Sequence, residues 1–224
     1  TDDDMPGAND TLRYSDSFFD TLTAANLAVA GENVTWDFSH LRPIRQGVKD
    51  YERALFTPYA FFFLGFNQYG VEEFESIGFG DFQFEDVYQF YRRNRNDFRA
   101  EGIGLRFRGL PIPAYYTDED EIYQFPLSFG DLNASTYSFQ LGLEQLGLVY
   151  ESVGTRTNEV DSWGTIITPY GTFECIRVIA NINSTDSVKV GDFAFGLPNN
   201  RIEYKWLAKD RKMPVLEISG NEVA

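Results

Sequence analysis

The chain has 224 residues, with 34 Asp and Glu against 19 Lys and Arg, and a formal net charge of -15 at pH 7. Affinity for nucleic acid and for anionic lipid comes mainly from Lys and Arg, so this balance argues against a nucleic acid partner and against membrane insertion. With 43% hydrophobic and 17% aromatic residues, the chain carries the apolar side chains for a core that a disordered acidic chain lacks.

Segments rich in β-branched and aromatic residues, separated by turn residues, fill most of the chain. One segment, residues 17–30, has helical periodicity after a Ser cap, although a loop followed by a strand fits it equally well. Strands are predicted at 33–38, 59–64, 87–93, 98–108, 122–125, 135–141, 148–157, 163–168, 172–182, 202–207 and 215–219. This pattern predicts an all-β fold, either an antiparallel two-layer β-sandwich or a curved half-barrel, with at most one or two short helices.

Length and the absence of a Ser- and Pro-rich linker favour a single β domain over residues 1–224, with the Pro-rich stretch 110–114 as the one candidate seam. The run 59–66 is so continuously apolar that it predicts a strand buried on both faces. The expected core residues are Phe62, Ile176, Val178 and Trp206.

Little in the sequence indicates catalysis. His40 is the only histidine, Cys175 is the only cysteine and lies in a predicted strand, and no Gly-x-Ser-x-Gly elbow is present. Structural zinc needs more His or Cys ligands than these two. We therefore expect no cofactor, with calcium as the one metal left open. Its candidate ligands are Asp118 and Asp120, in an acidic run that reads alternatively as a solvated loop.

Six arginines are concentrated between residues 92 and 108 of this acidic chain. We expect a hairpin that turns at 94–97 and places Arg106 and Arg108 side by side on one strand face. Cross-strand pairing with Glu85, Asp86 or the run 118–121 is one reading. The other is a site for a carboxylated or sulfated glycan, because the planar guanidinium binds such groups bidentately. That candidate ligand-binding set is Arg92, Arg93, Arg99, Arg106 and Arg108, with Tyr115 and Tyr116 either stacking on a sugar ring or closing the end of the sheet.

Several motifs are spread over nearly the whole chain: DMPG at 4–7, DTLRYS at 10–15, VTWDFS at 34–39, FPLSFGD at 125–131, WGT at 163–165, PYGTF at 169–173, YKW at 204–206 and PVLEI at 214–218. With them the chain resembles secreted Bacteroidetes proteins in which such a β region precedes a C-terminal sorting domain for type IX secretion. The last third also resembles extracytoplasmic domains built on a curved antiparallel half-barrel. The resemblance implies a secreted, extracellular or cell-surface location and carries over no catalytic residue. No signal peptide is visible in the sequence, so an export signal, if the chain had one, would have been removed near Thr1.

The sequence therefore predicts a non-catalytic extracellular or cell-surface β module for binding, adhesion or display, with a glycan or another cell-surface molecule as its partner. A secreted hydrolase that acts on glycans or peptides through a carboxylate pair is the alternative, because 34 acidic residues are enough to supply such a pair. A structural spacer is the third reading. Oligomeric state is left open.

Overall fold

The computed structural model describes residues 1–65, 67–79, 82–143 and 147–221. Its elements are almost all strands, with one seven-residue α-helix and two single-turn 3-10 helices, η1 (Asp2–Asp4) and η2 (Ala54–Phe56). In chain order they are β1 (Thr11–Ser17), α1 (Thr21–Leu27), β2 (Gly31–Asp37), β3 (Pro43–Arg53), β4 (Gln68–Phe79), β5 (Phe82–Arg93), β6 (Asp97–Phe107), β7 (Leu110–Gln124), β8 (Leu132–Leu143), β9 (Leu148–Thr168), β10 (Gly171–Val190), β11 (Phe193–Ala208) and β12 (Leu216–Asn221). The predicted all-β fold is confirmed.

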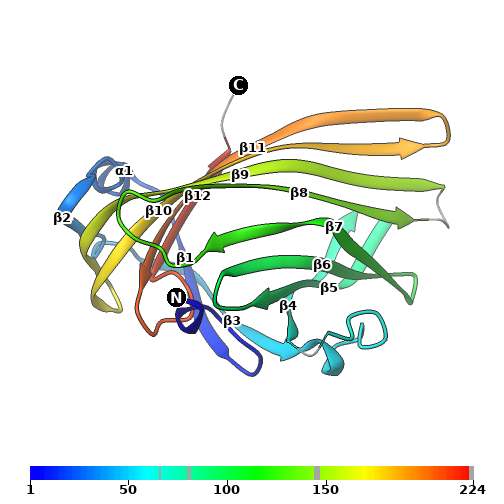
Figure 1. The fold of residues 1–224 in the computed structure, drawn as a ribbon, viewed down its shortest axis with the longest axis horizontal. Coiled ribbons are helices and arrows are strands. Elements are labelled where there is room, and N and C mark those ends of the chain that lie inside the picture. The colour runs from blue at the N-terminus through cyan, green and yellow to red at the C-terminus, as the bar shows by residue number, and fades with distance from the viewer. Residues whose placement is uncertain (66, 80–81, 144–146, 222–224) are drawn as a thin grey trace.

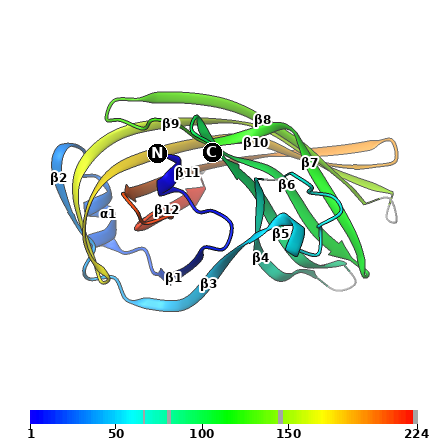
Figure 2. The same ribbon diagram turned by 60° about the horizontal axis from the view of Figure 1, so that its bottom comes forward.

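The strands form one long curved sheet in the order β1-β3-β4-β5-β6-β7-β8-β9-β10-β11-β12. All neighbours along this path are antiparallel. Strand β2 pairs in parallel with the C-terminal part of β9, between Ser162 and Ile167. Strands β8 to β11 lie along the top in Figure 1, and β3 to β7 curve beneath them. Figure 2 shows β1 and β3 on the side opposite β8 and β9. The two ends of the path, β1 and β12, do not pair, so the curved sheet is not closed.

Several predicted strands are longer in the structure than the sequence indicated. The segments 148–157 and 163–168 belong to the single strand β9, and β10 continues past 182 to Val190. β7 contains the Pro-rich stretch 110–114, the acidic run 118–121 and the predicted strand 122–125. The acidic run is therefore a strand and not a loop. Three strands were not predicted, namely β1, β3 and β4.

The predicted strand at 59–64 is wrong. This segment forms a turn in which the amide of Phe63 donates to the carbonyl of Tyr59, so the two aromatic rings lie on one side. Both rings are buried, whereas Phe61 between them is 89% exposed. A Cβ at Gly104 of β6 would lie 2.6 Å from the Tyr59 ring, and one at Gly102 would lie even closer to Phe63. Two glycines on one strand face thus provide the space in which these two rings sit.

The helix α1 is shorter than the periodic segment 17–30. Its cap is Asp20, whose carboxylate accepts from the amide of Thr23 at 2.7 Å, as expected for an N-cap side chain. Phe18 therefore precedes the helix, and Leu22 is exposed rather than packed on the sheet.

Arg177 of β10 fixes the end of this helix to the sheet. Its guanidinium, which is almost fully buried, donates to the carbonyl of Leu27 at 2.7 Å and forms two bonds with the carboxylate of Asp161 at 2.9 and 2.5 Å. The rings of Trp36 and Trp206 surround it at 5.5 and 5.8 Å. A buried charge needs such partners, since leaving it unpaired costs several kcal/mol.

The sheet is covered on both faces near Arg177 and Val178. These neighbours point to opposite faces, and both are buried. We call the face of Val178 and its cross-strand partner Val160 the inner face. Side chains from β3, β4, β6 and β7 pack on it, while the opposite face carries Trp206 and the residues around it. Of the expected core residues, Val178 and Trp206 are fully buried, and Phe62 and Ile176 are half-buried.

The first residues of the chain fill part of the inner face. Met5 is buried in the same cluster as Val178. Arg93 of β5 holds this segment by donating to the carbonyls of Asp2 and Met5 at 3.0 and 2.5 Å, and the Tyr69 hydroxyl donates to the carbonyl of Pro6 at 2.6 Å. The N-terminal segment is therefore part of the folded core.

Replacing Gly104 by Ala should lower the free energy of unfolding by about 1 to 3 kcal/mol, because the new methyl group overlaps the buried Tyr59 ring. Urea denaturation measures the change. Gly142 of β8 is the matched control, since a Cβ there meets nothing within 4 Å. Gly142→Ala should change stability by less than about 0.5 kcal/mol. Equal effects at the two glycines would show that the 59–64 segment does not dock on β6.

Candidate binding surface

The arginines of β5 and β6 are mostly engaged in ion pairs. The Arg92 Nε lies 2.5 Å from a carboxylate oxygen of the buried Glu101. Arg99 pairs with Asp97 and lies 3.2 Å from Glu119 of the neighbouring strand. A guanidinium already bound to carboxylates has fewer free donors for an anionic glycan.

The two arginines expected side by side are not arranged that way. Arg106 pairs with Asp86 at 2.8 Å, as the cross-strand reading requires. Strand β6 ends at Phe107, so Arg108 occupies the β6–β7 turn with a φ of 50° and its guanidinium lies 5.1 Å from the Phe107 ring centroid. The expectation of a shared strand face is wrong because the strand ends one residue before Arg108.

Tyr115 and Tyr116 point to opposite faces of β7, as adjacent strand residues do. The Tyr115 hydroxyl donates to the carbonyl of Phe62 at 2.7 Å, which ties the 59–64 turn to the sheet. Tyr116 is half-buried, with its ring centroid 4.8 Å from that of Phe139. The two rings therefore do not form one aromatic platform.

The two candidate calcium ligands have other partners. Asp118 accepts a hydrogen bond from the Thr136 hydroxyl. Asp120 is buried and receives two bonds from Arg156, at 2.7 and 2.8 Å. In the part of the chain that the structure describes, no group of three or more His, Cys, Asp or Glu side chains is placed to hold a metal ion.

A row of buried charges crosses the inner face of the sheet. Beyond Asp120, the Arg156 guanidinium lies 3.5 Å from Glu203 of β11, and Glu203 also pairs with Arg201 and Lys205, each at 2.8 Å. Burial alone would raise the pKa of Glu203, but Lys205, Arg156 and Arg201 together lower that pKa to about 2. Glu203 is therefore ionised at any ordinary pH and is unsuited to act as a general acid.

Neither His40 nor Cys175 has surroundings that suit a catalytic residue. The His40 Nε2 lies 3.3 Å from the Asp20 carboxylate and 3.2 Å from the Thr23 hydroxyl, where it packs beside the start of α1. Cys175 is buried, and this burial raises the pKa of its thiol to about 12. The thiol is protonated at neutral pH and is a poor nucleophile.

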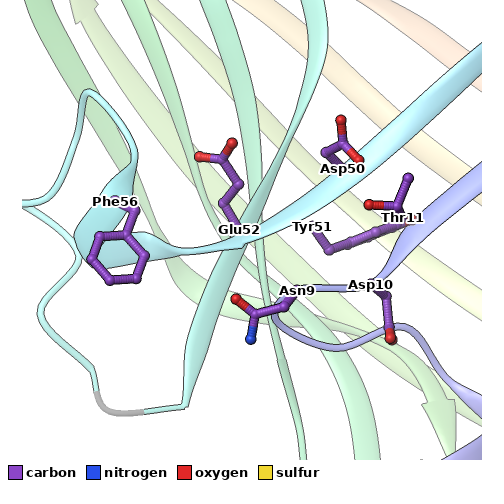
Figure 3. A pocket seen from close by; sticks show the side chains of 7 residues that line it. All are labelled: Asn9, Asp10, Thr11, Asp50, Tyr51, Glu52 and Phe56. Atoms are coloured by element: carbon purple, nitrogen blue, oxygen red, sulfur yellow. The ribbon is translucent and has the colours of Figure 1, made fainter.

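An open hollow of about 500 Å³ lies beside β1 and β3 (Figure 3). Its carboxylates do not converge: the Asp10 carboxylate accepts from the amide of Gly7 at 2.8 Å and points away from those of Asp50 and Glu52. It therefore lacks the arrangement of two facing carboxylates that glycoside hydrolysis needs. The residues that line it are Asn9, Asp10, Thr11, Asp50, Tyr51, Glu52 and Phe56.

The inner face becomes exposed and apolar toward the tip of the β10–β11 hairpin. Five large apolar side chains lie together there, on one face of two strands. We call them the apolar patch: Val188, Val190, Phe193, Phe195 and Leu197. Val188 pairs with Phe195, and Val190 pairs with Phe193, so these side chains are cross-strand neighbours. Phe193 is 84% exposed, Phe195 is 66% exposed and Leu197 is 56% exposed.

The patch continues a buried cluster in the neighbouring strands. Val188 of β10 pairs with Tyr150 of the neighbouring strand β9. Tyr150 is half-buried and packs against the cluster that contains Leu105, Phe107 and Phe139. The described members of this cluster come from β5 to β9. Strands β5 to β7 thus cover the inner face of β8 and β9, while β10 and β11 lie at the side of the sheet remote from them (Figure 1). The patch is exposed because the cover ends at β9.

The opposite face of the same hairpin has the usual character of a solvated surface. Lys189, between Val188 and Val190, pairs with Glu151 of β9 at 2.7 Å. Ala194 and Gly196 alternate with the exposed aromatics. The hairpin is therefore amphipathic with a period of two, and no element among the described residues covers its apolar side.

The outer edge of β11 is also free over residues 193–200. Pairing with β12 begins only at Arg201, and the structure describes no other strand beside this segment. Alternate residues along such an edge direct unpaired backbone groups to solvent. Edge strands are commonly protected from pairing with another chain by charged side chains or proline. Residues 193–200 contain no charged side chain, and Pro198 is their one such residue.

Sequence reasoning missed the patch. The alternation of apolar residues at 188 and 190, and again at 193, 195 and 197, on both sides of the turn Gly191-Asp192 is visible in the sequence. It predicts a hairpin with one apolar face. It does not indicate whether that face is covered.

Comparisons with family models, with curated proteins and with solved structures find no match to this chain. Among the described residues, no helix has the length and apolar character to cross a bilayer.

Replacing Glu203 by Gln should destabilise the protein most at neutral pH, because Arg156 and Lys205 then lose a buried partner. The folded pKa of about 2 lies below the ordinary value of 4.5, so the stability from ionised Glu203 is complete above pH 4.5 and disappears as pH falls toward 2. The difference between the two proteins should be on the order of 2 kcal/mol at pH 7 and should shrink below pH 4.5. Denaturation at several pH values measures it. Glu159→Gln, at an exposed position of β9, is the control, and a pH-independent difference for Glu203→Gln would contradict the network.

Proposed function

We propose that this chain is a non-catalytic extracellular or cell-surface module for binding, adhesion or display, and that it binds an apolar partner surface through the apolar patch. The observation that carries the proposal is the continuity of the inner face. The same face that forms the core between β5 and β9 continues, uncovered, onto β10 and β11. A partner that covers the patch would complete a packing arrangement that the described residues leave unfinished.

The size of the exposed surface supports a binding role. With aromatic side chains that bury about 150 to 250 Å² each, the five exposed side chains present roughly 500 Å² of apolar surface. The largest apolar patch of a typical monomer is about 300 to 600 Å² and is often functional. Phe61 and its exposed neighbours Leu55, Phe56 and Leu64 lie in a 3-10 helix and turns, so they do not share a regular strand face in this way.

The alternative of a secreted hydrolase has less support. The buried carboxylates of Asp97, Glu101, Asp120 and Glu203 each pair with an arginine. Such partners occupy the carboxylate oxygens that an acid or a nucleophile would have to present to a substrate. The extracellular location proposed here is supported by the resemblance to secreted β proteins.

The proposal is tested by panning random peptides displayed on phage against the immobilised protein. Enriched peptides should carry apolar residues at alternate positions, as strands that pack on the patch require. The double variant Phe193→Ser/Phe195→Ser should bind them at least about tenfold more weakly, because truncating buried aromatic contacts costs more than about 1 kcal/mol each. Both positions are exposed, so the variant should keep its thermal unfolding midpoint.

Phe61→Ser is the matched control, since it removes an equally exposed phenylalanine outside the patch and should leave peptide binding unchanged. Equal binding by the double variant and the original protein would contradict the proposal. A glycan panel run in parallel provides the second test. Retention of carboxylated or sulfated glycans that depends on Arg106, with no enrichment of peptides, would assign the binding surface to the arginines instead.

A further inference from the structure

We infer that the partner of the apolar patch is a second copy of this chain, with the inner faces of two β10–β11 hairpins packed against each other about a two-fold axis. This inference rests on the proposed function, because it specifies what covers the patch. In such an arrangement each hairpin takes the place, above its partner, that β5 to β7 take above β8 and β9. The result is a local two-layer sandwich built from two chains.

Charge is the first argument for a second copy. Two chains of net charge -15 repel each other over most of their surfaces. The patch contains no charged residue. The nearest charged group on the inner face of β10, Asp186, accepts from the Ser152 hydroxyl at 2.7 Å and from the Asn199 amide at 2.8 Å. The charged pair of Lys189 and Glu151 lies on the other face. The centre of this face can therefore meet a second copy without a charge in the contact, with Asp186, opposite Leu197, and Asp192, in the turn, at its border.

Shape and symmetry supply the second argument. A two-fold dimer uses the same surface on both partners, so the surface must complement itself. Phe193, Phe195 and Leu197 stand at every second residue of β11, and Val188 and Val190 form the parallel row on β10. A row of large side chains beside a row of smaller ones allows two such faces, turned by the two-fold axis, to interdigitate as packed sheets do at a spacing of about 10 Å.

The buried area is sufficient for a specific but weak dimer. With roughly 500 Å² of apolar surface on each copy, the interface would bury about 1,000 Å² in total, near the lower limit for specific protein interfaces. Interfaces of this size are typical of transient association. We therefore expect a monomer-dimer equilibrium, with dissociation in the micromolar range.

Sedimentation velocity over about 1 to 300 µM protein tests the inference. The original chain should shift from monomer to dimer with concentration, and Phe195→Lys should weaken the dimer at least about tenfold by placing a charge in the apolar contact. Val153→Lys is the matched control. Val153 is 51% exposed on the opposite face of the same part of the sheet, so this variant should dimerise like the original chain.

Mixing two variants gives a second test, in which dimerisation is regained and not only lost. Phe195→Lys and Phe195→Glu should each dimerise at least about tenfold more weakly than the original chain, whereas an equal mixture should dimerise more strongly than either variant alone, because opposite charges then lie in the same contact. A monomer at all concentrations, a dimer insensitive to Phe195→Lys, or a mixture that dimerises no better than either variant would each overturn the inference. Peptide binding that depends on Phe193 and Phe195 in a chain that stays monomeric would leave the proposed function standing and assign the patch to a different protein.

Discussion

The row of charges Asp120, Arg156 and Glu203 constrains the rest of the structure. These residues come from β7, β9 and β11, none of which is a neighbour of another in the sheet. Ladder hydrogen bonds join only adjacent strands, so this row adds connections across the inner face where the sheet curves. Removing one member leaves buried charges unpaired, which costs more than the pair itself contributes. The row thus connects three non-adjacent strands across the inner face of the curved sheet.

Curvature in turn decides which part of the inner face is covered. Where β5 to β7 bend over β8 and β9, their side chains form a buried cluster. Strand β10 is paired to β9 along its whole length and must follow it to the tip, and β11 follows β10. The apolar patch is therefore a consequence of topology: two strands extend as far as their neighbours while the layer above them stops.

The sequence predicted the all-β class and most strands of the second half, because alternation and turn residues are local signals. The turn at 59–64 was not predictable in this way. A run such as YAFFFLGF has no clear period, and its true arrangement depends on glycines about forty residues away in β6. The strand in the acidic run was not predictable for a similar reason, since Asp120 becomes a buried strand residue only through its pairing with Arg156 of β9.

In the candidate site, too, local patterns were predictable from the sequence and long-range contacts were not. The apolar alternation of residues 193–197 is a local pattern, whereas its exposure is set by how far β5 to β7 reach. The arginines between residues 92 and 108 are largely neutralised by carboxylates from adjacent strands. Composition indicated an unusual segment there, but only the register of the strands shows that its charges are balanced within the fold.

The contact between β6 and the 59–64 turn has a consequence for how this protein can diverge. Gly102 and Gly104 are empty positions that Phe63 and Tyr59 fill, so neither side of the contact can change alone. A larger residue at either glycine requires a smaller one in the turn, and a smaller ring in the turn leaves a cavity above the glycine. Natural variants of this chain should therefore exchange these positions in pairs, and such co-variation would mark the turn as an inherited part of the sheet.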